Sequence, residues 1–236
     1  MPFAVKMPKI LDSLQPGDSV AFTVCVERRE SWVENIRVVH FDSAERDPVQ
    51  ASRLKTLDTV TGGTKIQPLA VGEKAEFALT DQTGKPVKLS EFAGKVVVID
   101  FIYTRCPLPD YCFRLSSNFS RLQKRFAGTA DLVLLTVTFD PAHDGAEELA
   151  RYAQIWKADP RKWIFLTGSL FEIQQVCGLF GVGYWPDEGV FTHTLHTAVI
   201  DREGKLAANL EGNQFAAAQL GDLVRIVLNR RNGFIR

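Results

Sequence analysis

The sequence predicts an α/β fold in which helices cover both faces of a mixed sheet. Two largely apolar runs, residues 95–102 and 132–139, are rich in β-branched side chains, which is typical of strands buried on both faces. Segments with apolar residues at helical spacing follow these runs, so strands and helices alternate along the chain. Crossover helices between strands, with a hairpin late in the chain, indicate a sheet that contains both parallel and antiparallel strands.

The predicted elements follow one another from residue 75 to residue 230, each with its own local signal. In order, they are a hairpin over 75–92 that turns near Gly84, a strand over 95–102, a helix with Leu115, Phe119, Leu122 and Phe126 on one face, a strand over 132–139, a helix over 147–156, a strand over 163–167, a helix over 169–180 with Leu170, Ile173, Cys177 and Phe180 on one stripe, a hairpin over 196–210 that turns at 202–204, and an amphipathic helix over 215–230. This order matches a thioredoxin-like fold.

The first 41 residues have a different pattern from the rest. Residues 16–41 alternate polar and apolar side chains in two short strands with no helix, which predicts a small β module over 1–41. The segment 42–68 is polar and contains a Gly-Gly pair, which is typical of a linker. The thioredoxin-like domain is accordingly expected over residues 69–232.

Composition excludes several classes of function. The 236 residues are 45% hydrophobic and carry 28 basic and 28 acidic side chains, so the net charge is zero and no basic stripe indicates nucleic acid. No run of 18 apolar residues predicts a membrane span, and the first residues lack the pattern of a secretion signal. A small molecule or another protein is therefore the expected partner.

The positions of the four cysteines carry more information than their number, which is too small for a disulfide framework. Cys106 and Cys112 lie where a predicted strand is followed by a helix. A thiolate at a helix N-terminus has a lowered pKa and a raised reactivity, which favours chemistry over structure. Three interpretations are open: a disulfide that pins the loop, a thiol/disulfide exchange pair, and a soft metal site. The five-residue spacer differs from the Cys-x-x-Cys pair usual in thioredoxin-like oxidoreductases.

A soft metal site requires a third ligand. Two thiolates select Cu(I) or Zn, and one imidazole completes a three-coordinate set suited to Cu(I). Of the four histidines, His40 and His143 are expected to be solvated surface residues, whereas His193 and His196 lead into a late strand. Residues an odd number apart in an extended strand face opposite sides, so only one of these two can join the cysteines.

These segments together resemble the Sco/SenC family of copper-binding thioredoxin-like proteins, which support assembly of the CuA centre of cytochrome c oxidase. The resemblance covers roughly residues 69–232 and rests on the cysteine loop after a strand, an Asp-Pro after the next strand, and a histidine ahead of a later one. It implies Cys106, Cys112 and His193 as ligands of Cu(I) or Cu(II). It also implies that Asp140 orients the site as a hydrogen-bond acceptor.

The resemblance implies a copper metallochaperone that passes copper or electrons to the CuA-bearing subunit of cytochrome c oxidase or to another copper protein. Both thiols must be reduced before copper binds, which implies a thiol reductant as a further partner. The alternative is a thiol-disulfide reductase that uses Cys106 or Cys112 to keep a partner's copper-binding cysteines reduced. A peroxiredoxin-like peroxidase is weaker, because Thr104 and Cys106 are too close for its Thr-x-x-Cys motif.

The chain departs from the family pattern C-P-x-x-C-P in two respects. Its spacer is longer by two residues, and Phe113 follows the second cysteine in place of proline. The remaining cysteines, Cys25 and Cys177, are expected to serve packing, as is Trp32.

The N-terminal module resembles the second half of a CusF-like small β-barrel of the OB type. That family binds Cu(I) or Ag(I) through methionine thioethers in a Met-x-Met-Pro-Phe run, of which Met1, Pro2 and Phe3 match the end. The resemblance implies that earlier strands and a targeting segment lie upstream. The expected location is therefore the periplasm or the outer face of the inner membrane, with membrane association only through that upstream segment.

Overall fold

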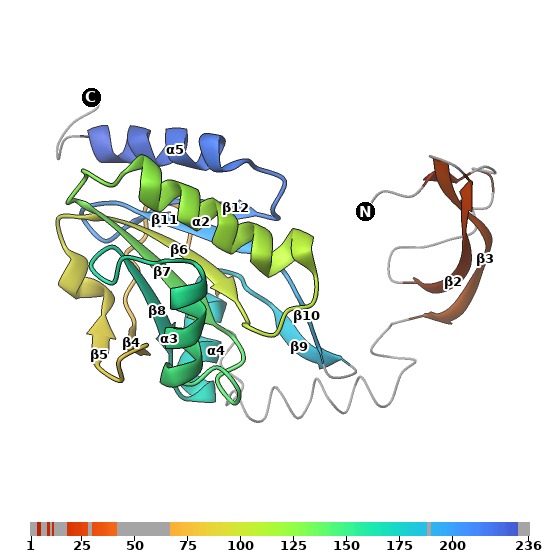
Figure 1. The fold of residues 1–236 in the computed structure, drawn as a ribbon, viewed down its shortest axis with the longest axis horizontal. Coiled ribbons are helices and arrows are strands. Elements are labelled where there is room, and N and C mark those ends of the chain that lie inside the picture. The colour runs from red at the N-terminus through yellow and green to blue at the C-terminus, as the bar shows by residue number, and fades with distance from the viewer. Residues whose placement is uncertain are drawn as a thin grey trace. The chain divides into compact units, whose positions relative to one another are not determined.

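The structure is a computed structural model that describes residues 4–5, 9, 11, 18–27, 30–41, 67–187 and 190–230 (Figure 1). The chain divides into two compact units, Met1–Thr64 and Lys65–Arg236. Residues 1–3, on which the CusF-like resemblance rests, lie outside the described residues, as does the predicted linker up to residue 66. The side chain of His40 also lies outside them. The predicted boundaries at residues 41 and 69 stay predictions.

The first unit contains a sheet of three strands. β2 (Asp18–Glu27) and β3 (Glu30–Phe41) pair antiparallel, and β1 (Ala4–Val5) lies parallel to β3 on its other side. The two long strands have ten and twelve residues, so they are longer than the polar-apolar alternation predicted. Cys25 and Trp32 are register partners in these strands, and both are half-buried.

The second unit is built on a mixed sheet of seven strands in the order β12-β11-β6-β7-β8-β4-β5. Their bounds are β4 (Ala78–Asp81), β5 (Pro86–Lys88), β6 (Val96–Ile102), β7 (Leu132–Thr138), β8 (Trp163–Thr167), β11 (His196–Ile200) and β12 (Leu206–Glu211). β6, β7 and β8 run parallel to one another. β11 pairs antiparallel with β6 and β4 pairs antiparallel with β8, whereas β12 and β5 pair antiparallel with β11 and β4. A short 3-10 helix, η2 (Leu89–Phe92), follows β5. The predicted mixed sheet is confirmed, with both hairpins at its edges.

Helices cover both faces of this sheet. They are α2 (Arg114–Arg125), α3 (Ala146–Ile155), α4 (Leu170–Leu179) and α5 (Ala217–Asn229). Phe119 of α2, Leu149 of α3 and Leu220 of α5 belong to one buried cluster, whereas Ile173 of α4 belongs to another. Alternate residues of β6 point into the two clusters, because successive side chains of a strand face opposite sides. The predicted α/β fold with both faces covered is confirmed.

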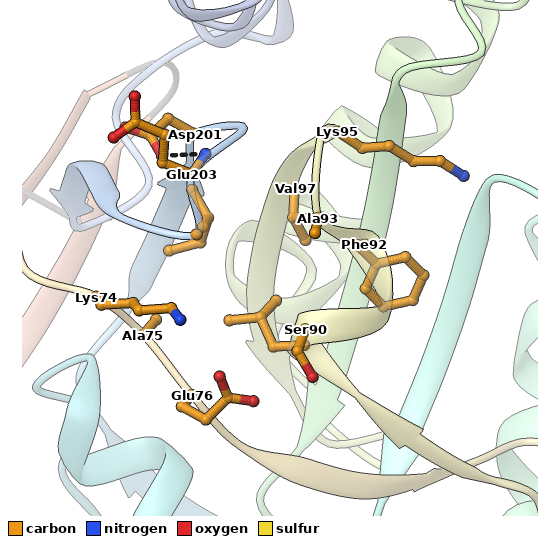
Figure 2. Close-up of a pocket in the computed structure, with 13 residues that line it drawn as sticks. Lys74, Ala75, Glu76, Ser90, Phe92, Ala93, Lys95, Val97, Asp201 and Glu203 are labelled. Carbon is orange, nitrogen blue, oxygen red and sulfur yellow. Dashed lines mark hydrogen bonds between the residues drawn. The ribbon is translucent and has the colours of Figure 1, made fainter. Parts of the chain in front are cut away.

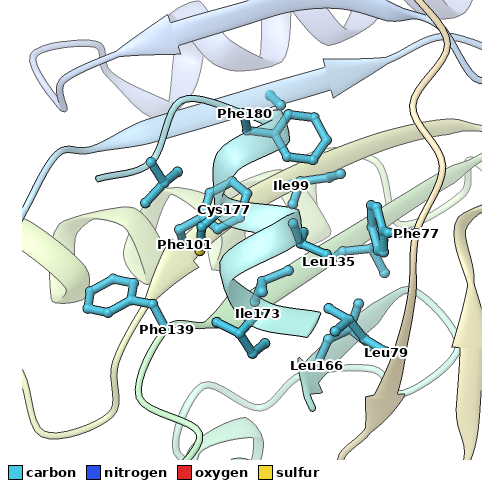
Figure 3. Packing of buried hydrophobic residues seen from close by; sticks show 14 of the residues in the cluster. Phe77, Leu79, Ile99, Phe101, Leu135, Phe139, Leu166, Ile173, Cys177 and Phe180 are labelled. Carbon is cyan, nitrogen blue, oxygen red and sulfur yellow. The ribbon is translucent and has the colours of Figure 1, made fainter. Parts of the chain in front are cut away.

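The stripe of α4 that packs on the sheet is shorter than the sequence predicts. Figure 3 shows Ile173, Cys177 and Phe180 among the buried side chains of the strands beneath α4. Burial raises the pKa of the Cys177 thiol, so this cysteine is a core residue with little reactivity. Leu170, predicted on the same stripe, is 49% exposed because it is the first residue of α4, ahead of the turn that packs.

None of the helices in the part of the chain that the structure describes is long and apolar enough to cross a membrane.

Candidate metal centre

The two cysteines of the loop lie between β6 and α2. Immediately before α2, residues Pro109–Phe113 form a single π-helical turn, η3, in which Tyr111 has a non-helical backbone conformation (φ −110°, ψ −108°). Cys112 belongs to this turn and is only 1% exposed, whereas Cys106 precedes the turn and is half-buried. The predicted location of both cysteines, after a central strand and before a helix, is confirmed.

A short hairpin that the sequence analysis missed carries the histidine. β9 (Tyr184–Asp187) and β10 (Val190–His193) pair antiparallel in a two-stranded sheet separate from the large one. The sequence does contain a signal for it, because Pro-Asp-Glu-Gly at 186–189 lies between aromatic and β-branched residues. His193 is the last residue of β10 and so lies where the hairpin returns to the main fold.

The structure brings Cys106, Cys112 and His193 together. The two sulfur atoms and one ring nitrogen of the histidine all lie within 4.8 Å of one another. No other group of three His, Cys, Asp or Glu side chains within the described ranges comes as close. Two sulfurs and one imidazole nitrogen at this separation can bind one soft metal ion.

The other late histidine occupies a different position. His196 opens β11, and its Nδ1 lies 3.2 Å from Asn209 Oδ1. Thr194 and Leu195 separate it from His193, so the two histidines belong to different strands. The premise that both lie in one extended strand is therefore wrong. The break between β10 and β11, rather than alternation within one strand, separates their side chains.

The imidazole of His193 is held on several sides. Its Nδ1 lies 2.9 Å from the carbonyl oxygen of Thr194, which accepts a hydrogen bond from Nδ1–H. With that proton engaged, Nε2 carries the lone pair that a metal ion needs. The ring centroid lies 4.6 Å from that of Phe139, 6.0 Å from Tyr103 and 6.2 Å from Tyr111. The backbone and the aromatic rings thus fix the orientation of the ligand.

The two thiols share one proton unequally. A hydrogen bond from Cys112 lowers the pKa of Cys106 to about 4, with a further contribution from His193, although burial opposes both. The same hydrogen bond, together with burial and the negative charge on Cys106, raises the pKa of Cys112. The more exposed sulfur is therefore the thiolate. The neighbouring cysteine, rather than the helix, is the main cause, and Cys112 shifts opposite to the expectation for a helix N-terminus.

Asp140 lies beside the cysteine loop. Among the described residues, no hydrogen bond joins its carboxylate to His193. Its carboxylate is 3% exposed and lies 2.8 Å from Arg105 Nη2 and 2.9 Å from His143 Nδ1. Because Arg105 directly precedes Cys106, this ion pair anchors the cysteine loop. His143 was predicted to be a solvated surface residue, and its side chain is 54% exposed, yet it is paired.

Asp144 is a second buried carboxylate at this edge, which the sequence analysis did not single out. It accepts hydrogen bonds from the backbone N–H of Thr104 at 2.9 Å, the Thr104 hydroxyl at 2.5 Å and the Thr138 hydroxyl at 2.6 Å. Burial raises its pKa although these hydrogen bonds favour the carboxylate. Asp144 therefore ties the segment before Cys106 to the end of β7. In the sequence, its position four residues after Asp140, in the segment that follows β7, indicates that it lies at the same edge.

A small cavity lies at the opposite end of β6 from the cysteines (Figure 2). It has a volume of about 90 Å³ and is lined in part by Lys74, Lys95, Val97 and Glu203. Among the residues that the structure describes, neither a cysteine nor a histidine lines it. The cavity is therefore separate from the cluster of two sulfurs and one imidazole.

Comparison with known proteins identifies the family. A family model described as SCO1/SenC matches residues 67–228, which is more than half of the chain. The chain belongs to the SCO1/SenC family. It is similar to the SCO1 protein homolog of Bacillus subtilis, with 31% identity over 116 residues that cover 48% of this chain and 59% of that relative. The chain spans between half and three-fifths of the length of the first curated relatives that it matches.

Solved structures of SCO1/SenC proteins share the fold of the second unit. A SCO1/SenC family lipoprotein from Bacillus anthracis matches with a TM-score of 0.59 at 27% identity, covering 66% of this chain and 95% of that one. Arabidopsis thaliana ScoI, solved with copper bound, matches with a TM-score of 0.55 at 26% identity, covering 66% and 97%. These likenesses confirm the predicted thioredoxin-like fold class.

Proposed function

We propose that this SCO1/SenC chain is a copper metallochaperone that carries one copper ion on Cys106, Cys112 and His193 and supports assembly of the CuA centre of cytochrome c oxidase. The observation that carries the proposal is the meeting of two sulfurs and one imidazole nitrogen within 4.8 Å. The likeness to a plant ScoI solved with copper bound supports it.

The donor set suits copper as a cargo. Thiolates are soft ligands that select Cu(I) over hard cations, and an imidazole suits both copper oxidation states. One thiolate exists before the metal arrives, because the pKa of Cys106 is lowered to about 4 by the hydrogen bond from Cys112. Copper binding then displaces the remaining proton from Cys112. The shared proton keeps the second thiol neutral until the cargo binds.

Delivery requires that a partner reach the ion. Cys106 is half-buried at the surface, whereas Cys112 is almost wholly buried, so an incoming thiolate from a partner meets the Cys106 side first. We take the partner to be the CuA-bearing subunit of cytochrome c oxidase or another copper protein. Transfer then proceeds by exchange of ligands, in which thiolates of the partner replace those of this chain one at a time.

A redox gate follows from the same pair of sulfurs. Oxidation of the Cys106 thiolate and the Cys112 thiol to a disulfide removes both sulfur ligands and releases two electrons and one proton to the oxidant. A thiol reductant is therefore a required partner before the next copper ion binds. The same oxidation, with a disulfide of the partner as the oxidant that takes up the two electrons, defines the second candidate function, a thiol-disulfide reductase. The lowered pKa of Cys106 favours it, because a thiolate is the attacking species in disulfide exchange.

The proposed location is the periplasm or the outer face of the inner membrane. The likeness to a SCO1/SenC lipoprotein from Bacillus anthracis supports a membrane surface as the place of action.

A transfer assay separates the two functions. The Cu(I)-loaded reduced chain, mixed with a reduced, metal-free soluble CuA domain, should lose its copper to that domain, as measured by copper content after separation. Metal-free reduced chain, mixed with the same domain in its disulfide form, tests reduction by counting free thiols. Transfer of copper in the first mixture supports the metallochaperone. Thiol formation in the second mixture with no copper transfer in the first would establish the reductase in its place.

A further inference from the structure

Four exposed apolar side chains lie on the two segments that carry the metal ligands. Leu108, Tyr111 and Phe113 belong to the cysteine loop, and Trp185 belongs to the hairpin of His193. These four side chains, here called the apolar rim, are 48%, 37%, 58% and 42% exposed in that order. The other exposed large apolar side chains in the described part of the second unit lie outside these two segments and are Val71, Ile155, Leu170, Phe171 and Ile226.

The apolar rim borders the ligand atoms. The Cys106 sulfur lies 3.9 Å from the carbonyl oxygen of Leu108, so this residue is next to the more exposed of the two sulfurs. The ring centroid of Tyr111 lies 6.2 Å from that of His193. Trp185 lies in β9, and the register of the hairpin places it opposite the residue that precedes His193. Both segments therefore bring exposed apolar groups beside the metal ligands.

Contacts with distant parts of the domain hold the cysteine loop in this arrangement. The side-chain amide of Asn213 donates a hydrogen bond to the carbonyl oxygen of Asp110. The ring centroid of Phe113 lies 4.9 Å from that of Trp156, which follows α3. These contacts fix the backbone before α2 while more than half of the Phe113 side chain stays exposed. Apolar groups that are exposed in a fixed arrangement form a surface preorganised for binding.

The transfer of copper indicates what covers the apolar rim. During ligand exchange, a sulfur of this chain and a sulfur of the acceptor bind the same ion, so the two protein surfaces meet around Cys106. The side chains next to Cys106 are then removed from water, and the burial of apolar side chains stabilises the complex. An acceptor fits this surface when apolar side chains surround its own copper-binding thiolates.

We propose that the apolar rim is the docking surface for the copper acceptor, with Leu108 and Trp185 as anchors on the two ligand-bearing segments. The acceptor presents an apolar protein face around its thiolates. The inference rests on the proposed metallochaperone function and adds the surface that selects the partner. Leu108 and Tyr111 belong to the five-residue spacer, and Phe113 stands where the family pattern has proline. The departures from the family pattern therefore supply most of the apolar rim.

The test compares Leu108→Ser and Trp185→Ser, each made alone, with the control variants Ile155→Ser and Ile226→Ser. All four changes replace an exposed apolar side chain with a hydroxyl. Ile155 is the last residue of α3, and Ile226 lies in the last turn of α5. Both helices begin where β7 and β12 end, which is the end of the sheet that carries the metal site, and run back to the opposite end. The controls are therefore remote from the ligands.

The first readout is the rate at which the Cu(I)-loaded chain transfers copper to a reduced, metal-free soluble CuA domain, measured below saturation. Leu108→Ser and Trp185→Ser should each slow the transfer about tenfold, because each removes an apolar anchor from the complex. Their Cu(I) affinity, titrated against a competing chelator, should stay within about twofold of wild type, since neither side chain is a ligand. Both controls should transfer copper within about twofold of the wild-type rate.

The second readout measures docking without copper. A Cys106→Ser/Cys112→Ser chain lacks both sulfur ligands, and its binding to the metal-free CuA domain is followed by NMR titration. Adding Leu108→Ser or Trp185→Ser to this chain should weaken the binding about tenfold, whereas adding either control change should leave it within about twofold.

The outcomes separate this inference from the proposed function. If wild type transfers copper and both Leu108→Ser and Trp185→Ser transfer and dock like wild type, the apolar rim is wrong and the metallochaperone stands. Slower transfer that is matched by an equal loss of Cu(I) affinity would also overturn the docking role. If wild type transfers no copper but the Cys106→Ser/Cys112→Ser chain docks through the rim, the metallochaperone is wrong and the docking surface stands. Absence of both transfer and docking refutes both proposals.

Sedimentation of the metal-free reduced chain tests a different occupant of the apolar rim. The proposal expects the wild type, the rim variants and the controls to share one oligomeric state. A wild-type dimer that Leu108→Ser and Trp185→Ser convert to monomers, while Ile155→Ser and Ile226→Ser do not, would show that a second copy of this chain covers the rim. That result would overturn the copper acceptor as its occupant.

Discussion

Replacing His193 with alanine is expected to weaken Cu(I) binding by the reduced protein at least about 100-fold, whereas His196→Ala should leave the affinity within about threefold. The reason is the position of the two rings. A nitrogen of His193 lies within 4.8 Å of both Cys106 and Cys112 sulfurs, whereas His196 is the register partner of Glu211 at the start of β11 and pairs with Asn209.

His196→Ala is a matched control, because it removes the same chemical group three residues away in the chain. Both variants are titrated with Cu(I) in the presence of a competing chelator, with free thiols counted beforehand so that oxidation does not mimic a lost ligand. Retained affinity in His193→Ala, with loss in His196→Ala, would contradict the assignment of the nitrogen ligand.

Replacing Asp100 with asparagine is expected to make the protein progressively more stable than wild type as the pH rises. Asp100 lies in the middle of β6 and is fully buried. Its Oδ1 accepts a hydrogen bond from the Thr136 hydroxyl at 2.6 Å, while Oδ2 has no partner among the described residues. Burial raises its pKa to about 8, and the hydrogen bonds from the Thr136 hydroxyl and from its own backbone offset this only in part.

The direction of this pH dependence follows from the protonation of Asp100 in the folded and the unfolded chain. The unfolded chain releases the Asp100 proton near pH 4, whereas the folded protein keeps it up to about pH 8. The contribution of Asp100 to stability is therefore present in full below about pH 4 and is lost as the pH rises to 8. Asparagine does not titrate. The advantage of Asp100→Asn should grow by roughly 1.4 kcal/mol per pH unit, or about 4 kcal/mol between pH 4 and pH 7.

The measurement is urea unfolding of both metal-free proteins at several pH values between 4 and 8. The test is the difference between the free energies of unfolding of the two proteins as a function of pH. Cys106, whose pKa is lowered to about 4 by Cys112, makes both proteins more stable as the pH rises, and this contribution cancels in the difference. A constant difference across this range would mean that Asp100 ionises normally in the folded protein.

Asp81→Asn provides a control of opposite sign. Partial burial raises the pKa of Asp81, but hydrogen bonds donated by Thr83 and the Lys85 amide outweigh it, so the pKa is lowered. The carboxylate of Asp81 therefore stabilises the fold above the unfolded pKa and loses this contribution as the pH falls through its folded pKa. Asparagine at this position should cost stability near neutral pH and become neutral in acid.

The sequence predicts the central part of this fold well because β6 and β7 are buried on both faces and so contain almost only apolar residues. All fourteen of their residues are buried, and no tertiary information is needed to recognise such runs. The β9–β10 hairpin was missed for the opposite reason. Its strands are four residues long and pair with no other strand in the described part of the chain. Its stability therefore depends on contacts with Tyr103 and Phe139, which local patterns do not reveal.

The candidate site was predictable in its residue types but not in its electrostatics. The spacing of Cys106 and Cys112 after a strand, and a late histidine, could be recognised from the chain alone. The unequal sharing of one proton depends on which sulfur is buried, and the irregular turn η3 decides this by placing Cys112 in the core. The ion pair between Asp140 and Arg105 likewise becomes visible only when β6 and β7 lie side by side.

Copper uptake by the reduced protein, compared with the disulfide form, tests the central claim most directly. The reduced chain should bind one copper ion, because Cys106, Cys112 and His193 all offer ligand atoms within 4.8 Å of one another. The oxidised chain should bind it much more weakly, since the disulfide removes both thiolates. Cys177→Ser, which alters a buried core thiol in α4, should take up copper as wild type does. Equal copper uptake by the reduced and fully oxidised proteins would contradict the account.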